Sequence, residues 1–270
     1  MKMDNKYKQL LNYLRKKEKI IIAFSGGVDS TFLLKAAKDA LGSNVKAITV
    51  KSPYISDWEI KEAVEFAKNL DVEHEILEIT HIDPSIEKNP DNRCYLCKKI
   101  IFNNIIDRAE KEGYKYVCDG TNFDDTKDHR PGMIALRELN VISPLLECGY
   151  TKDEIRNQSK ILNLYTWDKP AYACLMTRLP YNVEVSKEDL IKIEKSEKFL
   201  MDLGFKAVRV RHHGNLARIE VDPLMREKLF SIELLDKIGK KLKEIGYTYV
   251  TFDVLGYSMG SFNIELQKDV

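Results

Sequence analysis

The 270-residue sequence has almost no excess charge of either sign, because 43 Lys and Arg residues balance 42 Asp and Glu residues to a net charge of +1. This balance excludes a nucleic-acid binder that depends on a strongly basic chain, although a local basic face is compatible with it. The sequence also lacks any apolar run near the roughly 18 residues that a transmembrane helix needs. Residues 1–19 hold no apolar stretch ahead of a small-residue cleavage site, so we expect no signal peptide.

Cysteine is scarce as well: the sequence has five, an odd number that argues against a disulfide framework. Free thiols persist in a reducing compartment, so we expect a soluble cytoplasmic protein with no membrane partner. What the sequence does contain is 44% hydrophobic and 31% charged residues, which is typical of a folded globular chain. Its length allows one large domain or two unequal ones.

The first 167 residues alternate short apolar runs with amphipathic segments. The runs predict five strands, at residues 19–24, 45–50, 72–79, 114–118 and 141–146. The amphipathic segments predict helices at residues 29–41, 58–70, 98–110, 133–139 and 151–162. Thr151 and Glu154 form a capping box at the start of the last of these helices. We therefore expect an α/β domain over residues 1–167, with a parallel sheet and helices on both of its faces.

The rhythm changes after residue 167. Residues 168–180 contain two prolines and no clear period, so we predict a loop that links two domains and carries Cys174. Residues 181–270 predict a smaller α+β domain for substrate binding or oligomerisation. Its helices are expected at residues 186–203 and 223–245, and its strands at residues 206–212, 217–221 and 247–254.

A glycine-rich turn, Ser25-Gly26-Gly27-Val28-Asp29-Ser30, lies between the first predicted strand and the first predicted helix. Glycines let backbone N–H groups approach an anion, and the helix N-terminus adds partial positive charge, so the turn favours phosphate. Ser25, Ser30 and Thr31 could add hydroxyl donors. The lysine of the kinase-type phosphate loop and the G-x-G-x-x-G dinucleotide pattern are both missing. The alternative is a plain strand-to-helix turn in which glycine serves only the geometry.

The motif S-G-G-V-D-S resembles the signature of the PP-loop ATP pyrophosphatases, and the resemblance covers about the first 165 residues. Such proteins cleave ATP to AMP and pyrophosphate and adenylate an oxygen of their substrate. Asp119-Gly120-Thr121-Asn122 and Ser143-Pro144-Leu145 look like further marks of this superfamily. The resemblance implies a set of residues for ATP and Mg²⁺: Ala23, Ser25, Gly26, Gly27, Asp29, Ser30, Thr31, Val50, Gly120, Asn122, Asp125 and Arg130. Asp125 could equally be a helix cap.

Three cysteines are candidates for a sulfur or metal site. Cys94 and Cys97 form a C-x-x-C just before a predicted helix, and Cys174 lies in the linking loop. Three thiolates could hold an iron–sulfur cluster or zinc. The pair could instead be a redox dithiol, a zinc half-site completed by His81 or His129, or two residues with no ligand role.

The two remaining cysteines do not pair with these three. Cys118 lies on a predicted buried strand, where cysteine usually acts as a small hydrophobe. Cys148 follows the fifth predicted strand.

Residues 119–132, 169–178 and 209–220 together resemble the LarE-type sulfur transferases, over nearly the whole chain. That family builds the nickel-pincer nucleotide cofactor of lactate racemase. The resemblance implies that the chain adenylates a carboxylate of pyridinium-3,5-dicarboxylic acid mononucleotide and replaces an oxygen by sulfur. It also implies a sulfide donor and a homo-oligomer as partners.

Members of that family follow two routes to sulfur. Some have one cysteine in the K-P-A-x-x-C segment and give up its sulfur, which leaves dehydroalanine. Others use three cysteines to hold a [4Fe–4S] cluster whose open iron can bind sulfide. Because Cys94, Cys97 and Cys174 are all present, this sequence matches the second kind, and sacrificial transfer from Cys174 is the alternative.

Arginines are the candidates for the substrate's anionic groups. Arg209 and Arg211 are two apart on a predicted strand, so their side chains leave the same face, and two guanidiniums suit a phosphate monoester. The family resemblance associates this pair with the substrate phosphate, and Arg178, four residues after Cys174, is a candidate for catalytic charge beside the sulfur site. Arg218 and Glu220 likewise share a face of the next predicted strand, and the alternative is a solvated strand face with Arg–Glu pairs across the two strands.

Three other functions compete with this one. A tRNA-thiolating PP-loop enzyme would need a basic nucleic-acid face, which the balanced charge disfavours, so nucleic acid is not an expected partner. An amide-forming synthetase would adenylate a carboxylate for ammonia and would not need three cysteines. A non-catalytic nucleotide-binding or zinc-stabilised module would bind ATP without releasing pyrophosphate.

Overall fold

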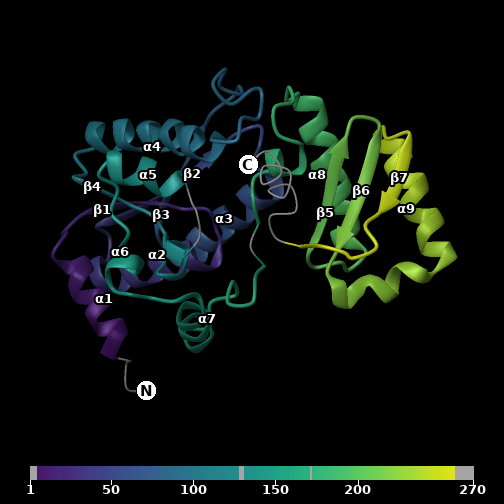
Figure 1. Ribbon diagram of the computed structural model, residues 1–270. Helices are drawn as coiled ribbons and strands as arrows, with labels where there is room; N and C mark the ends of the chain where they lie inside the picture. The colour runs from purple at the N-terminus through teal and green to yellow at the C-terminus, as the bar shows by residue number, and fades with distance from the viewer. Residues whose placement is uncertain (1–4, 128–130, 171, 259–270) are drawn as a thin grey trace. The chain divides into compact units, whose positions relative to one another are not determined.

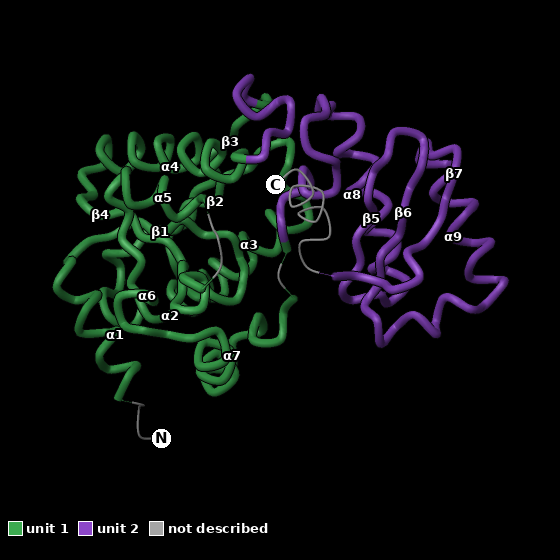
Figure 2. Tube along the Cα trace, viewed as in Figure 1, with its two compact units in different colours: residues 1–82, 92–172 green, residues 83–91, 173–270 purple. Residues whose placement is uncertain are grey.

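The computed structural model describes residues 5–127, 131–170 and 172–258, and the chain forms two compact units (Figures 1 and 2). Unit 1 consists of Met1–Ile82 and Asn92–Tyr172, and unit 2 of Asp83–Asp91 and Ala173–Val270. The chain therefore leaves unit 1 for residues 83–91, returns to it, and leaves it again after Tyr172.

Unit 1 is built on a sheet of four parallel strands, β1 (Ile20–Ala23), β2 (Val45–Lys51), β3 (Glu73–Glu78) and β4 (Tyr116–Cys118). The strand order is β3-β2-β1-β4, so β1 and β2 are central. Both central strands are buried along almost their whole length, which explains their near-continuous apolar sequences. Because all four strands run in one direction, the loops that leave their carboxyl ends gather at one edge of the sheet.

Helices cover both faces of this sheet (Figure 1). Ile20 and Ile22 join a core with α1 (Asn5–Arg15), α2 (Val28–Leu41), α3 (Asp57–Asn69) and α7 (Lys152–Ile161). Ile21, between them, joins the opposite core with α4 (Arg93–Lys111) and α5 (Pro131–Glu138). Successive strand side chains point to opposite faces, so the Ile-Ile-Ile run serves both cores. The predicted α/β class, with helices on both faces of a parallel sheet, is confirmed.

Two predictions for unit 1 need correction, and one helix was not predicted. Residues 141–146 are not a fifth strand: Ile142 makes a single parallel bridge to Cys118, and α6 (Pro144–Glu147) follows at once. Pro144 explains the change, because it has no N–H for a sheet ladder and suits the first turn of a helix. Helix α4 begins at Arg93, so the C-x-x-C lies inside its first turns rather than before it. Helix α1, which was not predicted, buries Tyr7, Leu10, Leu11 and Leu14.

Unit 2 has a three-stranded sheet of β5 (Val208–His213), β6 (Leu216–Val221) and β7 (Tyr249–Phe252). Strands β5 and β6 are antiparallel, and β7 is parallel to β6 at the edge. Its core also contains side chains of α8 (Lys187–Asp202) and α9 (Ile232–Ile245). The single helix predicted at 223–245 is wrong, because a 3₁₀ helix, η3 (Pro223–Phe230), precedes α9. Ser231 separates them by accepting a hydrogen bond from Leu234 N as the N-cap of α9.

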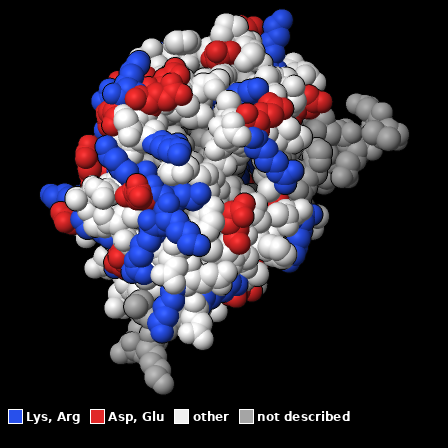
Figure 3. Space-filling view, turned by 90° about the vertical axis from the view of Figure 1, so that its left-hand side faces the viewer, with Lys and Arg blue, Asp and Glu red and all other residues white. Residues whose placement is uncertain are grey.

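The charges of unit 1 are unevenly distributed although the whole chain is nearly neutral. Figure 3 shows Lys and Arg side chains gathered near the middle of the face turned toward the viewer, with acidic side chains around and between them. Near the amino ends of β1 and β4, Lys17 and Lys115 lie 4.7 and 5.4 Å from the Tyr116 ring centre. These cations lie at the end of the sheet opposite the glycine loop. Within the described ranges, no helix combines the length and apolarity needed to cross a membrane.

A histidine in unit 1, His74, is connected through the Thr49 hydroxyl to Phe24, the residue just before the glycine loop. The hydroxyl of Thr49 donates to Phe24 O at 2.7 Å and lies 2.7 Å from His74 Nε2. The hydroxyl uses its proton on Phe24, so it accepts from an Nε2–H of His74. Burial lowers the pKa of His74 and also that of His212 in unit 2.

This burial predicts acid sensitivity. The unfolded chain binds protons on these histidines near their ordinary pKa of 6.5, whereas the folded chain binds them only at lower pH. We therefore expect the free energy of unfolding to fall as the pH drops below about 6.5, by up to about 1.4 kcal/mol per pH unit for each histidine. His74→Gln, which keeps a donor for Thr49 but does not titrate, should reduce the slope. Urea unfolding between pH 7 and pH 5 measures it, with exposed His213→Gln as the control; equal slopes for H74Q and wild type would contradict the assignment.

Candidate functional site

The glycine loop connects β1 to α2 at the carboxyl edge of the sheet. Gly27 is the N-cap of α2, and Asp29 lies in the first turn of this helix. Gly26 has φ +66°, and a Cβ there would lie 3.1 Å from the Cα and Cβ of Ala63 on α3. Only glycine fits this backbone without strain or displacement of α3. The loop therefore presents the N-terminus of a 14-residue helix in the manner of an anion site.

Hydroxyl groups hold the loop in shape. Ser25 Oγ lies 3.1 Å from Ser30 Oγ and accepts a hydrogen bond from Gly27 N at 3.4 Å. Ser30 Oγ also lies 3.3 Å from Gly27 O and donates to it. Thr31, the next residue on the helix, has a buried Oγ1 with no hydrogen-bond partner among the described residues. A buried hydroxyl without a protein partner is available for a hydrogen bond to a ligand that binds at the loop.

Asp29 is the acidic group of the loop. Its Oδ2 accepts a hydrogen bond from Lys152 Nζ at 2.6 Å, at the start of α7. Its Oδ1 is buried and has no hydrogen-bond partner among the described residues. A carboxylate oxygen with a vacant acceptor beside a phosphate loop is the ligand type that Mg²⁺ takes. The loop residues therefore fit a nucleotide with Mg²⁺: the N–H and hydroxyl groups suit its phosphates, and the Asp29 carboxylate suits its metal ion.

Two further segments meet the glycine loop from neighbouring strands. A Cβ on Gly120, after β4, would lie 3.0 Å from Ser30 N, so the absence of a side chain allows this close approach. The adjacent Asp119 is buried and accepts hydrogen bonds from Thr121 Oγ1 and, at 2.6 Å, from Ser143 Oγ. The two motifs that follow the fourth and fifth predicted strands are thus bonded to each other beside the loop.

The other residues predicted for ATP and Mg²⁺ occupy different settings. Asn122 is buried, and its Oδ1 accepts from the backbone N–H groups of Asp124 and Asp125 at 2.9 and 3.3 Å. Asp125 in turn accepts from Asn122 N at 3.0 Å, so the pair closes the turn into η1 (Asp124–Lys127). Ala23 ends β1, and Val50 is in the second core beside the end of β2. Arg130 lies outside the described residues.

Lys169 is a site residue that the sequence analysis missed. Its Nζ donates to Gly26 O in the glycine loop at 3.0 Å and to Glu62 Oε2 at 2.6 Å. Its side chain is 11% exposed and lies 5.3 Å from the Phe66 ring centre. The K-P-A motif that carries it was visible, but no local pattern connects residue 169 with residue 26. A cation therefore lies beside the proposed phosphate-binding turn.

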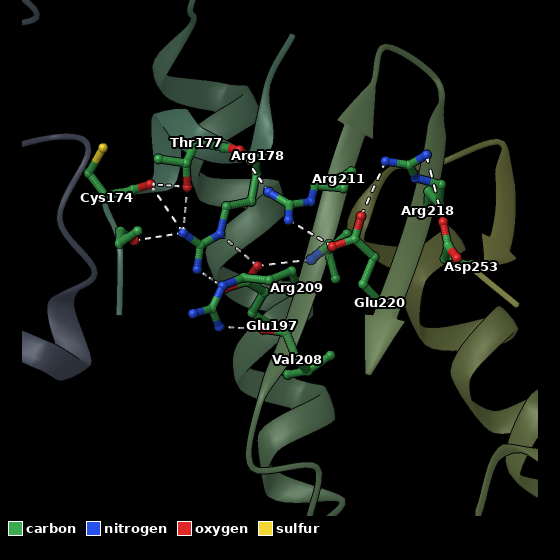
Figure 4. A network of polar contacts seen from close by, with 12 residues as sticks. Cys174, Thr177, Arg178, Glu197, Val208, Arg209, Arg211, Arg218, Glu220 and Asp253 are labelled. Atoms are coloured by element: carbon green, nitrogen blue, oxygen red, sulfur yellow. Dashed lines mark hydrogen bonds and ion pairs between the residues drawn. The ribbon is translucent and has the colours of Figure 1, made fainter. Parts of the chain in front are cut away.

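In unit 2, Arg178 is the centre of a buried polar network (Figure 4). It is 2% exposed and forms a two-pronged pair with Glu197, through Nε to Oε1 at 2.9 Å and Nη2 to Oε2 at 2.8 Å. Its Nη1 donates to Ala173 O at 2.6 Å and to Cys174 O at 3.1 Å. Arg178 thus contacts the backbone of the predicted sulfur residue, while the Cys174 thiol points away from the network (Figure 4).

Arg211 and Arg209 continue this network on β5. Arg211 is 5% exposed; its Nη2 donates to Glu220 Oε2 at 2.7 Å, and its Nη1 donates to Thr177 O at 2.9 Å. Arg209 is 4% exposed, and its guanidinium lies 5.0 Å from the Tyr257 ring centre. Both arginines are buried rather than solvated, although Arg211 does pair across the strands with Glu220.

The network concentrates positive charge. Among the residues that the structure describes, its buried members are three guanidiniums, of Arg178, Arg209 and Arg211, and two carboxylates, of Glu197 and Glu220. Burial, and then the nearby cation of Arg178, lower the pKa of Arg209. Guanidiniums present several N–H donors that match carboxylates and phosphates, so a cluster of this kind suits an anionic ligand.

The cysteines divide into two groups by exposure. Cys94 is exposed and Cys97 is half-buried in unit 1, where a spacing of three places both on one side of α4. Cys174 is half-buried in unit 2, as the N-cap of η2 (Leu175–Arg178). Cys118 is a member of the first core, and burial raises its pKa to about 12. Among the described residues, no group of three or more His, Cys, Asp or Glu side chains is arranged to hold a metal ion.

The close approach of Gly120 to α2 yields a prediction. Gly120→Ala would place a methyl group 3.0 Å from Ser30 N, so the loop and helix must separate. We expect the Kd for a non-hydrolysable ATP analogue to rise about tenfold. This rise equals roughly 1.4 kcal/mol of binding free energy, which lies in the range that overpacking typically costs. Calorimetric titration measures the Kd. The matched control is Gly239→Ala, because a Cβ on Gly239 in α9 meets nothing within 4 Å. An unchanged Kd in G120A would show that ATP does not use this turn.

Comparison with known proteins identifies the family of the chain. Residues 3–115 match the model of the NAD synthase family. An uncharacterised protein of Synechocystis is 38% identical over 98% of this chain and 100% of its own length. An uncharacterised protein of Methanocaldococcus jannaschii is 37% identical over 92% of this chain and 94% of its own. The pyridinium-3,5-bisthiocarboxylic acid mononucleotide synthase of Lactiplantibacillus plantarum is 33% identical over 96% of this chain and 94% of its own. The chain therefore belongs to the family of this synthase, the LarE-type PP-loop proteins.

Proposed function

We propose that this protein is an ATP-dependent sulfur transferase that adenylates a carboxylate of pyridinium-3,5-dicarboxylic acid mononucleotide and converts it to a thiocarboxylate. The similarity to the Lactiplantibacillus plantarum synthase supports this substrate. The observation that carries the proposal is the cluster of buried guanidiniums of Arg178, Arg209 and Arg211 in unit 2, in a chain whose other unit has the glycine loop at the start of α2. A mononucleotide with carboxylates is anionic at both its phosphate and its ring, which suits such a set.

The glycine loop performs the activation step. The N–H groups at the start of α2 and the hydroxyls of Ser25, Ser30 and Thr31 would hold the β- and γ-phosphates of ATP. Lys169, 3.0 Å from Gly26 O, would oppose the negative charge that grows on the departing pyrophosphate. Mg²⁺, held through Asp29, would neutralise further charge on the phosphates. The substrate carboxylate then attacks the α-phosphorus, and the carboxyl–AMP bond replaces the α–β phosphate bond.

A carboxylate is a poor electrophile, and adenylation makes its carbon reactive toward nucleophiles. Delocalised negative charge shields its carbon, and AMP both removes this charge and provides a leaving group. A sulfur nucleophile then attacks the acyl carbon, and AMP departs. Thiolate and hydrosulfide are strong nucleophiles near neutral pH and need no histidine base. Arg209 and Arg211 would hold the substrate phosphate, and Arg178 would hold the backbone of Cys174.

The source of sulfur is the finer part of the proposal. We propose that Cys94, Cys97 and Cys174 hold a [4Fe–4S] cluster, which would supply a replaceable sulfide at its open iron. The presence of all three thiols and the exposure of Cys94 support it. The alternative is sacrificial transfer of the Cys174 sulfur without a cluster.

Measurement of pyrophosphate release tests the activity. The full chain with ATP and Mg²⁺ should release pyrophosphate on addition of the pyridinium dicarboxylate mononucleotide. Bulk tRNA should produce none; release with tRNA would favour an RNA-thiolating enzyme, and ATP binding without release would favour a binding module. A product amide with ammonia would favour a synthetase. Arg209→Met should raise the KM for the mononucleotide about tenfold or more, because a charge-assisted contact is lost. Arg226→Met, at an arginine outside the network, is the control.

Iron analysis tests the sulfur source. The chain purified without oxygen should contain about four irons and four acid-labile sulfides, and Cys94→Ser with Cys97→Ser should remove them. Cys148→Ser is the control, because this thiol is buried in the first core. An iron-free chain with full activity would exclude the cluster. Loss of one H₂S from Cys174 after a single turnover, seen by mass spectrometry, would then identify the sacrificial route.

A further inference from the structure

The segment that carries Cys174 depends on side chains to satisfy its backbone. Residues 173–180 contain the short 3₁₀ helix η2, and their carbonyl groups accept hydrogen bonds from four side chains, one of which is the nearby Thr177, whose Oγ1 donates to Cys174 O at 2.8 Å. Ala173 O and Cys174 O accept from Arg178, Thr177 O accepts from Arg211, and Met176 O, Leu179 O and Pro180 O accept from Asn89. A buried carbonyl without a donor is costly, so these side chains determine the path of the segment.

Asn89 supplies the largest share of these contacts. It is fully buried, and its Nδ2 lies 2.7 Å from Pro180 O, 3.2 Å from Leu179 O and 3.4 Å from Met176 O. Its own carbonyl accepts from Asn182 N at 3.1 Å, which joins the two segments by backbone as well. Residues 83–91 thus belong to unit 2 through this contact, although they precede β4 of unit 1 in the sequence (Figure 2).

The chemistry of asparagine fits this position. Asn89 has φ +48°, a left-handed conformation that asparagine tolerates better than most residues other than glycine. Its amide nitrogen offers two N–H donors at the end of a short side chain. Aspartate would point a carboxylate at three carbonyl oxygens, and glycine would keep the backbone but lose the donors. Position 89 therefore requires a residue that both tolerates a left-handed backbone and carries side-chain N–H donors.

We propose that Asn89 is a positioning residue for sulfur transfer, because it fixes the conformation of the segment that carries Cys174 and Arg178. The inference rests on the proposed function for the role of Cys174, whereas the contacts of Asn89 are independent of that function. Removal of the Asn89 amide should loosen η2 without altering the glycine loop, since Asn89 belongs to unit 2 and the loop to unit 1.

The first test measures the segment itself in Asn89→Gly, which keeps the backbone conformation. Hydrogen exchange should become about tenfold faster at the amides of Thr177 and Leu179, which donate to Cys174 O and Met176 O within the segment. In a background of C94S and C97S, iodoacetamide should alkylate Cys174 faster. Asn163→Gly is the matched control, because Asn163 is exposed and has φ +56°. Rates in N89G within about twofold of those in N163G would overturn the proposal.

The second test separates positioning from general stability. In the chain with all cysteines, N89G should lower kcat for thiocarboxylate formation about tenfold and leave the KM for ATP within about twofold. Asn89→Ser, with one hydroxyl donor, should restore part of the kcat. An unchanged kcat in N89G despite faster exchange would overturn the positioning role. If the wild-type chain forms no thiocarboxylate, the proposed function has failed, whereas exchange and alkylation still decide whether Asn89 holds the segment.

Discussion

Every buried backbone carbonyl needs a donor, and the two segments that carry the proposed chemistry lie outside the regular ladders of the fold. The glycine loop meets this constraint with the Ser30 hydroxyl, which donates to Gly27 O, and with Lys169, whose ammonium donates to Gly26 O. The Cys174 segment meets it with the guanidinium of Arg178 and with other distant donors. In both places a charged side chain serves the backbone as well as the proposed ligand. The fold can therefore hold a reactive segment in an irregular conformation.

This double use has an energetic reason. A buried guanidinium has five N–H donors, and a single carboxylate satisfies only two of them. Arg178 directs its remaining donors to Ala173 O and Cys174 O, and Arg211 directs one to Thr177 O. Breaking such a buried pair by removing one partner typically costs about 3–5 kcal/mol. Substitution at Arg211 would therefore disturb the stability of the fold. Arg209 also serves the backbone, since its Nη1 donates to Val208 O at 2.8 Å, and its guanidinium lies 5.0 Å from the Tyr257 ring centre.

Local sequence predicted those parts of the structure that local physics decides. The Ile20–Ile22 run predicted a buried strand, and the glycine pair after it predicted the turn into α2. Thr151 and Glu154 form the capping box that their spacing predicted. The fifth strand was wrong because Pro144 ends the extended segment after one bridge. Lys169 and Asn89 could not be found in this way, because their partners lie 143 and about 90 residues away. The pairing of Arg178 with Glu197 was not predicted either, because these residues lie 19 positions apart in the sequence.

The detour of residues 83–91 has a consequence for synthesis on the ribosome. These residues emerge early, but Asn182 and the carbonyls of Met176, Leu179 and Pro180 emerge about 90 residues later. At the usual elongation rates of about 5–20 residues per second, Asn89 waits several seconds for its partners. Strand β4 and helix α4 must pack onto β1 during this interval, with the detour as a tethered loop that has not yet closed. Unit 1 can thus complete its sheet before unit 2 begins, and the loop that holds the Cys174 segment can close only after Asn182 has emerged.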